Sequence, residues 1–374
     1  MSVAIVDVRE WQNILDLKTG KKIDVDTPAV QMIKGILQKH PYPGDTALES
    51  NSWVTDTALA LQESYDPQFI FLSYAQQFFA TRYIKTTEAE RQAMYDAVFA
   101  EIARFTQESG FVPVVVGTGD IVPAAGFIDL SKLDGLAVCS HWATHYAGLY
   151  NLSDRDMEYV KNVEQIERIV SRKDFIEAFN GKPGDDERLP EYLVTAREGF
   201  CFRTPDLRRP LTIPACGYSI PVATPLGEVA AITDLGAHIL DQLRHHKIAL
   251  IIVEGIGIKD FRLPFNPCSN GVAWYFYEPG DAQYLAISQG VHQMFAYCPG
   301  YRYYQEASDD YPFSGYFNTI PENTIGKRFA GKSIAVGNRS MFMHTLTGTD
   351  IAIECFARNL NNQGCLAVIH REDK

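Results

Sequence analysis

Two histidines in the string SHWATH are the first candidates for chemistry in this sequence. His141 and His145 lie four residues apart, a spacing that places both imidazole rings on one side of a helix. Neutral imidazole is a common metal ligand, so the pair predicts a site for one divalent cation, zinc or manganese. The alternative is structural, with both rings packed at a helix start under Trp142 and Tyr146, since no glutamate completes a His-Glu-x-x-His motif.

A phosphate-loop pattern, GKRFAGKS, occupies residues 326–333. In phosphate loops such a string follows a strand and opens a helix, whose first amides then bind the phosphates. Here residues 334–337 are strand-like where that helix must begin, so we expect a basic turn between strands. Four basic residues near this turn form either a local anion patch or a solvated face: Lys327, Arg328, Lys332 and Arg339.

The elements that must position these groups alternate between short apolar runs and segments of helical period. This alternation is typical of an α/β fold with a mainly parallel central sheet. The expected strands are 3–8, 69–74, 112–116, 136–139 and 248–253, and the expected helices are 28–39, 53–65, 87–108, 155–179 and 227–246. Residues that follow the strands are the ones to inspect, because ligands of such sheets bind beyond the carboxyl ends of the strands.

The net charge and the aromatic content of the sequence change near residue 247. Residues 1–247 carry a net charge of −10 and form the expected α/β domain, whereas residues 248–374 carry −2 and are rich in Tyr and Phe. We expect this second part to be an α+β unit or to complete the same sheet. Its expected strands are 272–277, 284–287, 301–304, 333–336 and 365–370, with one helix at 350–360.

Composition and charge narrow the range of functions. The 374 residues include 34 Lys and Arg against 46 Asp and Glu, a formal net charge of −12, which disfavours binding of nucleic acids. The apolar start at residues 3–8 is too short for a signal peptide, and prolines interrupt the longest uncharged stretch, so we expect a cytoplasmic protein that does not enter membranes. Seven widely spaced cysteines without a Cys-x-x-Cys pair indicate neither disulfides nor structural zinc.

Several segments, in order and spacing, resemble the alkaline phosphatase superfamily, in particular its type I phosphodiesterase and nucleotide pyrophosphatase branch. The string DPQFIFL at residues 66–72 is similar to the family's "pdllfvyl", and VVVGTGD at 114–120 is similar to the strand that ends in Ser-Asp-His-Gly-Met. Further similar segments are 53–61, 81–83, 126–131, 189–193 and 228–240. The resemblance implies an alkaline-phosphatase-like sandwich and phosphoester chemistry.

The metal motifs of that family are altered in this chain. Gln77 and Thr81 stand where the family has Asp and His, and Gly119 and Asp120 stand where Asp and His are adjacent. Neutral Gln and Thr oxygens are weak zinc ligands, and a two-metal centre needs most of its ligands to hold both cations. The resemblance therefore implies a protein that has lost the usual two-zinc site.

The same resemblance provides candidates for a rebuilt site. Asp7 ends the first expected strand, where the family places its first metal Asp, and Thr46 is then nearest to the nucleophile, with Asp120 as a second catalytic candidate. The string IIVEGIG at residues 251–257 is a second candidate for the family's first motif. It is similar to the opening "vvDGlg", with Glu254 in place of Asp. The alternatives are a capping role for Asp7, a capping or paired role for Glu254 and a structural role for Thr46.

Three functions follow from these observations. The first is a non-classical alkaline-phosphatase-like protein that binds a phosphorylated small molecule. The second is a divergent metal-dependent phosphodiesterase with zinc or manganese held by some of the ligands Asp7, Asp120, His141, His145 and Glu254. The third is an interaction protein that uses the aromatic strings at residues 274–277 and 301–304 as a homo-oligomer or partner surface.

Overall fold

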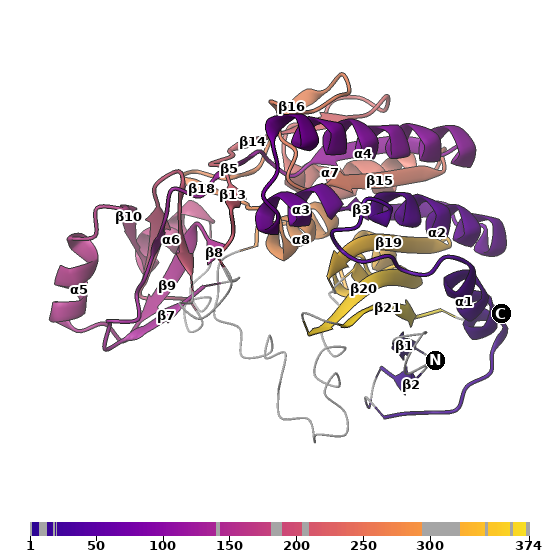
Figure 1. Ribbon diagram of the computed structural model, residues 1–374, viewed down its shortest axis with the longest axis horizontal. Coiled ribbons are helices and arrows are strands. Elements are labelled where there is room, and N and C mark those ends of the chain that lie inside the picture. Colours follow the sequence, from indigo (N-terminus) through magenta and orange to yellow (C-terminus); the bar gives the residue numbers. More distant parts are fainter. Residues whose placement is uncertain are drawn as a thin grey trace.

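Five parallel strands form the centre of a ten-stranded mixed sheet in the computed structural model (Figure 1). The structure describes residues 2–6, 13–17, 19, 21–139, 143–180, 189–203, 209–293, 322–340, 343–359 and 362–371. The parallel strands, in spatial order, are β4 (Val112–Gly117), β15 (Ile248–Val253), β3 (Phe69–Tyr74), β19 (Ser333–Ser340) and β20 (Ile351–Asn359).

Antiparallel strands extend this centre on both sides. Beside β4 lie β14 (Ser219–Ala223) and β16 (Asn266–Ser269), and beside β20 lie β21 (Asn362–Ile369), β1 (Val3–Val6) and β2 (Asn13–Asp16). The protein is therefore a mixed α/β protein, parallel at the centre of the sheet and antiparallel at its flanks. Strands from both sides of residue 247 pair in this sheet, and the division of the chain at that residue stays a prediction.

Two hydrophobic cores lie on opposite faces of the sheet, because successive strand side chains alternate in direction. On β3, Phe69 and Phe71 belong to one core, whereas Ile70 and Leu72 belong to the other. The second core includes helices α1 (Pro28–Lys39), α2 (Ser50–Tyr65) and α4 (Glu88–Ser109). The first includes α7 (Ile232–Gln242), α8 (Asp281–Gln289), α9 (Ile325–Arg328) and α10 (Met343–Thr347). The sheet is thus covered by helices on both faces.

A smaller lobe projects from the side of the main sheet that carries β4 and β14 (Figure 1). Its four-stranded sheet consists of β10 (Ile166–Ser171), β11 (Tyr192–Ala196), β9 (Tyr146–Tyr150) and β7 (Leu136–Val138). The accompanying elements are β6 (Gly126–Ile128), β8 (Ala143–Thr144), β12 (Phe200–Arg203), α5 (Asp154–Lys161) and α6 (Arg172–Ala178). Two-stranded sheets are formed by β5 (Ile121–Pro123) with β13 (Thr212–Pro214) and by β17 (Gly271–Val272) with β18 (Tyr275–Phe276).

Most of the predicted strands and helices are confirmed. Strands occur where 69–74, 112–116, 136–139, 248–253 and 333–336 were expected, and helices where 28–39, 53–65 and 87–108 were expected. The helix expected at 227–246 is the shorter α7, and the strand expected at 365–370 is part of β21. Residues 301–304 lie outside the described residues.

The single helix expected at 155–179 is wrong. The structure has α5, then strand β10, then helix α6. Serine side chains cap both helices, since Ser153 accepts from the amide of Asp156 and Ser171 from that of Asp174. An irregularity in the pairing at Ile166 shifts the alternation of β10, so its buried residues imitate a helical period.

Two other expectations in the second part are also wrong. Residues 351–359 form strand β20 and not a helix, because residues 351–355 are all buried and a strand buried on both faces shows no alternation. Residues 284–287 lie within α8 and not in a strand. This helix begins after Gly280 and ends at Gly290, whose φ of 74° is left-handed, as is common at helix ends.

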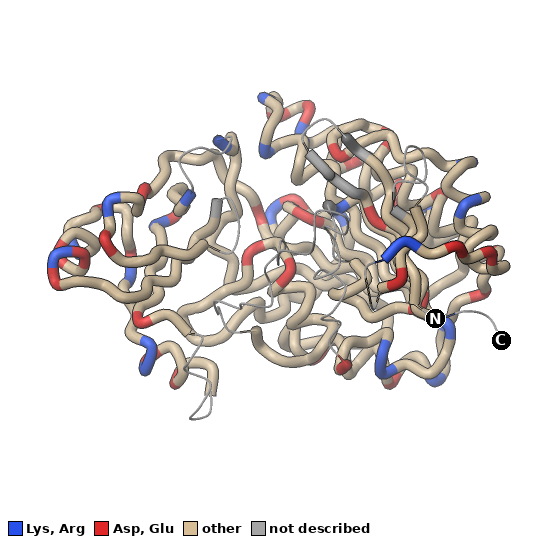
Figure 2. Tube along the Cα trace, turned by 90° about the horizontal axis from the view of Figure 1, so that it is seen from below, with Lys and Arg blue, Asp and Glu red and all other residues tan. Residues whose placement is uncertain are grey.

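Charges of both signs are dispersed over the described part of the chain (Figure 2). None of the described helices is long and apolar enough to cross a membrane.

Candidate functional site

Polar residues gather where the parallel strands end. The carboxyl ends of β3, β4, β15 and β19 lie at one edge of the sheet, because these strands run in the same direction. The residues there are largely buried, among them Ser73, Thr118, Glu254, Asn338 and Arg339. Such an edge is the usual ligand-binding place of open parallel sheets. We name Ser73, Glu254, Asp281, Tyr284 and Arg339 the carboxyl-edge cluster.

A buried arginine joins two carboxylates in this cluster. The Nε atom of Arg339 lies 3.1 Å from Oε1 of Glu254, and its Nη2 atom lies 2.9 Å from Oδ1 of Asp281. The exposed fractions of these side chains are 9% for Arg339, 1% for Glu254 and 14% for Asp281. Buried charges of this kind persist only when they are paired. The guanidinium is therefore held in a fixed position, with Asp281 as its more accessible partner.

A tyrosine connects the arginine pair to strand β3. Tyr284 donates a hydrogen bond of 2.6 Å to Glu254, and its hydroxyl lies 2.8 Å from Oγ of Ser73. Burial and the Glu254 charge raise the pKa of Tyr284 well above its usual value, so the phenol keeps its proton at neutral pH. Since that proton bonds to Glu254, Ser73 is the donor to the tyrosine oxygen. The Arg339 guanidinium also lies 4.8 Å from the centre of the Tyr284 ring.

Three helices begin at this edge of the sheet. They are α2, α8 and α3 (Gln76–Tyr83), whose N-caps are Glu49, Gly280 and Ala75. None of these helices has a capping hydrogen bond from its N-cap side chain, and Ala75 and Gly280 offer no side-chain acceptor. The dipoles of α2 and α3 are therefore not masked by an N-cap side chain, whereas the first turn of α8 carries the carboxylate of Asp281. In Figure 1 the starts of α2, α3 and α8 lie near one another, at the end of β3 and β19.

Asn338 joins two of these helix starts to strand β19. Its Nδ2 donates to Oγ of Ser50 and Oδ1 of Asn51, both at 2.9 Å, and its Oδ1 accepts from the amide of Ala75 at 2.7 Å. Asn338 is fully buried. One side chain thus fixes the starts of α2 and α3 relative to the residue that precedes Arg339.

Gln77 and Thr81 on α3 are engaged in internal hydrogen bonds. Gln77 donates through Nε2 to the carbonyl oxygens of Tyr74 and Glu254 and accepts from Asn51. Thr81, one turn further along α3, donates to the carbonyl of Gln77 at 2.8 Å. Both side chains are buried. The amide and the hydroxyl are therefore parts of the scaffold.

Asp120 supports a turn. It follows β4, and its Oδ1 accepts from the amide of Gly257 at 3.1 Å, just beyond the end of β15. Burial raises the pKa of Asp120, while hydrogen bonds from the amides of Lys259 and Gly257 act in the opposite direction. A Cβ atom at Gly257 would lie 2.3 Å from the amide nitrogen of Asp120, so the two segments are in close contact. Asp120 therefore holds the turn after β15 against the end of β4.

His145 does not lie on a helix. It occupies the bend between β8 and β9, so the helical geometry expected for the histidine pair is wrong at this position. Burial lowers the pKa of His145 to about 4, which keeps the ring neutral at neutral pH. Its ring packs against Tyr146 and Phe276, with ring centres 4.8 and 4.9 Å apart. Residues 7 and 141, that is Asp7 and His141, lie outside the described residues.

Sequence reasoning missed a glutamate beside His145. The backbone amide of His145 donates to Oε1 of Glu278 at 2.9 Å. Burial raises the pKa of Glu278 to about 7, although this amide and the positive charge of Arg82 both lower it. The string EPGD that begins at Glu278 predicts a turn, and no feature of the sequence places it next to the small lobe.

The remaining catalytic candidate lies before α2. Thr46 is half-buried, and its carbonyl oxygen accepts from Nε2 of Gln76 at 3.4 Å. Among the described residues, no group of three or more His, Cys, Asp or Glu side chains is arranged to hold a metal ion. A zinc or manganese centre that uses Asp7 and His141 stays a prediction, because both lie outside the described part of the chain.

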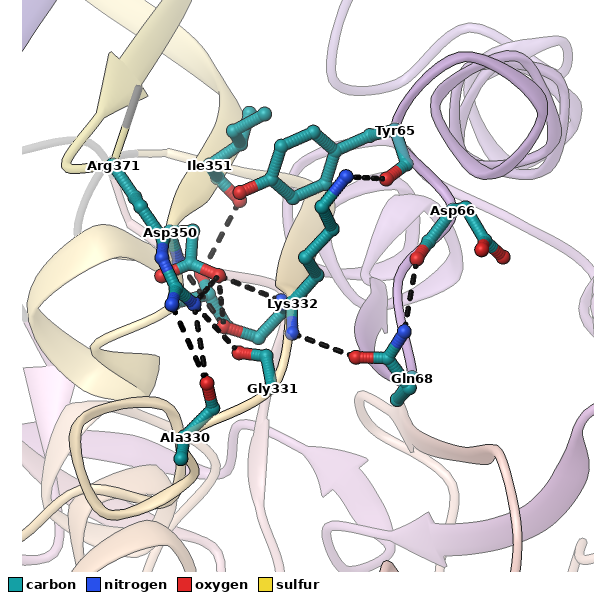
Figure 3. A network of polar contacts seen from close by, with 11 residues as sticks. Tyr65, Asp66, Gln68, Ala330, Gly331, Lys332, Asp350, Ile351 and Arg371 are labelled. Carbon is teal, nitrogen blue, oxygen red and sulfur yellow. Dashed lines mark hydrogen bonds and ion pairs between the residues drawn. The ribbon is translucent and has the colours of Figure 1, made fainter. Parts of the chain in front are cut away.

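The phosphate-loop pattern lies at the opposite, amino edge of the sheet, where Ser333 begins β19. Figure 3 shows the polar contacts around Lys332 and Asp350. The Nζ atom of Lys332 donates to the carbonyl of Tyr65 at 3.0 Å, and the backbone amide of Lys332 donates to Gln68. The amide and hydroxyl of Ser333 donate to Oδ2 of Asp350, which also lies 3.6 Å from Nη1 of Arg371. Lys332 thus connects the start of β19 to the end of α2 and to the residue before β3, and Ser333 connects it to the residue before β20. Since β19 separates Lys332 from Arg339, these two do not share an anion patch.

No protein-family model matches the chain, and no curated protein matches it at a significant level.

Proposed function

We propose that this protein binds a phosphorylated small molecule at the carboxyl edge of its parallel strands, without a two-zinc centre. The observation that carries the proposal is the position of the buried Arg339 guanidinium beside the start of α8, next to Asn338, which binds the starts of α2 and α3. Helix N-termini and guanidinium groups are the two protein features that most directly favour a phosphoryl group.

The positive charge at the carboxyl edge of the sheet is the guanidinium of Arg339. In a two-zinc hydrolase, metal ions would compensate the charge of carboxylates and phosphate. Here Arg339 compensates Glu254 and Asp281, and neutral Gln77 and Thr81 fill the positions of the family's metal ligands. A guanidinium binds and orients a phosphoryl group but cannot generate a metal-bound hydroxide. We therefore propose binding in place of metal-dependent hydrolysis.

The test is calorimetric titration of chelator-treated protein with inorganic phosphate and phenyl phosphate. We expect saturable binding by the wild-type chain, loss of binding in Arg339→Met, and weakened binding in Arg339→Lys, which keeps the charge but not the bidentate geometry. Arg328→Met removes an exposed arginine of α9 and serves as the matched control. Absence of saturable binding by the wild-type chain, or unchanged binding in a folded Arg339→Met variant, overturns the proposal.

A second measurement separates this proposal from a rebuilt metal site. Stoichiometric zinc or manganese that is lost in His141→Ala or His145→Ala, together with hydrolysis of a bis-aryl phosphate above an Asp120→Asn control, would favour the phosphodiesterase. The interaction-protein alternative receives little support from the described aromatic residues, because Tyr275, Phe276 and Tyr277 are all buried.

A further inference from the structure

We infer that Asp281 makes this site selective for a protonated phosphate group over sulfate. The inference rests on the proposed function and specifies the class of anion. Asp281 lies 2.9 Å from Nη2 of Arg339, and Glu254 lies 3.1 Å from Nε of the same guanidinium. Any anion that binds to Arg339 therefore comes close to at least one carboxylate.

An anion that joins Glu254 and Asp281 at this guanidinium is repelled by both carboxylates unless it donates a hydrogen bond to one of them. A phosphate monoester has its second pKa at about 6 and carries a hydroxyl below that pH. This hydroxyl can donate a hydrogen bond to a carboxylate oxygen. Sulfate carries no proton near neutral pH and can only accept hydrogen bonds, so it meets the carboxylate without a donor. A carboxylate beside the arginine thus distinguishes two anions of similar shape and size.

Asp281 is better placed for this role than Glu254. Glu254 already accepts a hydrogen bond from Tyr284, and its side chain is only 1% exposed. Asp281 is the first residue of α8, directly after the N-cap Gly280, and its side chain is 14% exposed. A ligand that reaches the start of α8 therefore contacts Asp281 before it contacts Glu254.

The experiment is isothermal titration of the full chain with inorganic phosphate and with inorganic sulfate, at pH 6 and pH 8 and equal ionic strength. We expect the wild-type chain to bind phosphate about tenfold or more tightly than sulfate at both pH values, because inorganic phosphate still carries one proton at pH 8. Phenyl phosphate, titrated in the same way, should lose this preference at pH 8, where its second proton has dissociated. In Asp281→Asn, whose amide donates to either anion, sulfate binding should strengthen and the ratio should approach unity. Asp241→Asn, an exposed acid of α7, is the control for net charge and should keep the wild-type ratio.

The titrations distinguish a failure of the selectivity from a failure of the proposed binding function. Equal affinity of the wild-type chain for phosphate and sulfate, or an unchanged ratio in Asp281→Asn, overturns the selectivity while the binding function stands. Failure of the wild-type chain to bind either anion overturns the proposed function and this inference with it. Asp281→Ser provides a second test if the asparagine variant does not fold, because serine also suits the first turn of a helix.

Discussion

The side-chain amide of Gln77 donates a 2.7 Å hydrogen bond to the backbone carbonyl of Glu254. This bond joins helix α3 to the residue that follows β15, although the two are separated by 177 positions in the sequence. A neutral side-chain amide thus connects the start of α3 to the carboxyl end of β15.

Replacement of Gln77 should therefore destabilise the fold. Gln77→Ala leaves the carbonyls of Tyr74 and Glu254 without this donor in a buried setting, and we expect a loss of about 1–3 kcal/mol in the free energy of unfolding. Urea denaturation measures the loss. Gln38→Ala, on the exposed side of α1, should change the stability by less than about 0.5 kcal/mol. Equal effects of the two substitutions would contradict the scaffold role of Gln77.

Removal of Glu254 should cost more than removal of a surface acid. Glu254→Ala deprives buried Arg339 of one carboxylate and Tyr284 of its acceptor, and we expect a loss of about 3–5 kcal/mol. Asp241→Ala breaks the exposed pair with Arg244 and should cost less than about 1 kcal/mol. Denaturation curves for both variants test the difference, and a Glu254→Ala loss as small as that of Asp241→Ala would contradict the structural account.

Glu278 should make stability fall as the pH rises. Its pKa is about 7 in the folded protein, against about 4.5 for an ordinary glutamate, so the folded state holds a proton that the unfolded chain releases between these values. The free energy of unfolding should decline from about pH 4.5 to pH 7 and level off above. In Glu278→Gln this contribution is absent. If the difference between wild type and variant stays constant from pH 5 to pH 8, the raised pKa is wrong.

His145 should make the protein less stable as the pH falls below about 6.5. Its pKa is about 4 in the folded protein and 6.5 for an ordinary histidine, so the unfolded chain binds a proton more readily. The free energy of unfolding should fall by about 2–3 kcal/mol as the pH decreases from 6.5 to 4. His145→Phe keeps the ring contacts with Tyr146 and Phe276 and should lack this loss. Thermal unfolding across this pH range compares the two proteins.

The centre of the fold could be predicted from sequence because its strands are short, apolar runs bounded by helices of clear period. Strands 69–74 and 248–253 are buried along their whole length and were correctly identified. The same property misled the prediction for residues 350–360, since a fully buried strand has no alternation that distinguishes it from a helix. Residue propensity and hydrophobic period do not reveal which strands and helices a segment will pack against in the fold.

The candidate site could be predicted only in part, because its members come from distant segments. Glu254 was found, since it directly follows an apolar strand. Arg339 also follows such a strand, but the sequence grouped it with Lys332, whereas β19 places the two at opposite edges of the sheet. Asp281 and Tyr284 lay in a segment expected to contain a strand. Only the helix α8 brings these two side chains to the same arginine.

The order of strands in the sheet has a consequence for synthesis of the chain. Strand β3 has β15 on one side and β19 on the other, so its two neighbours are separated from it by more than 170 positions in the sequence. A growing polypeptide that has reached residue 240 exposes both edges of this apolar strand. Such edges pair readily with other chains, and folds dominated by distant pairings form slowly. The nascent protein should therefore depend on chaperones until the segment that forms β19 has left the ribosome.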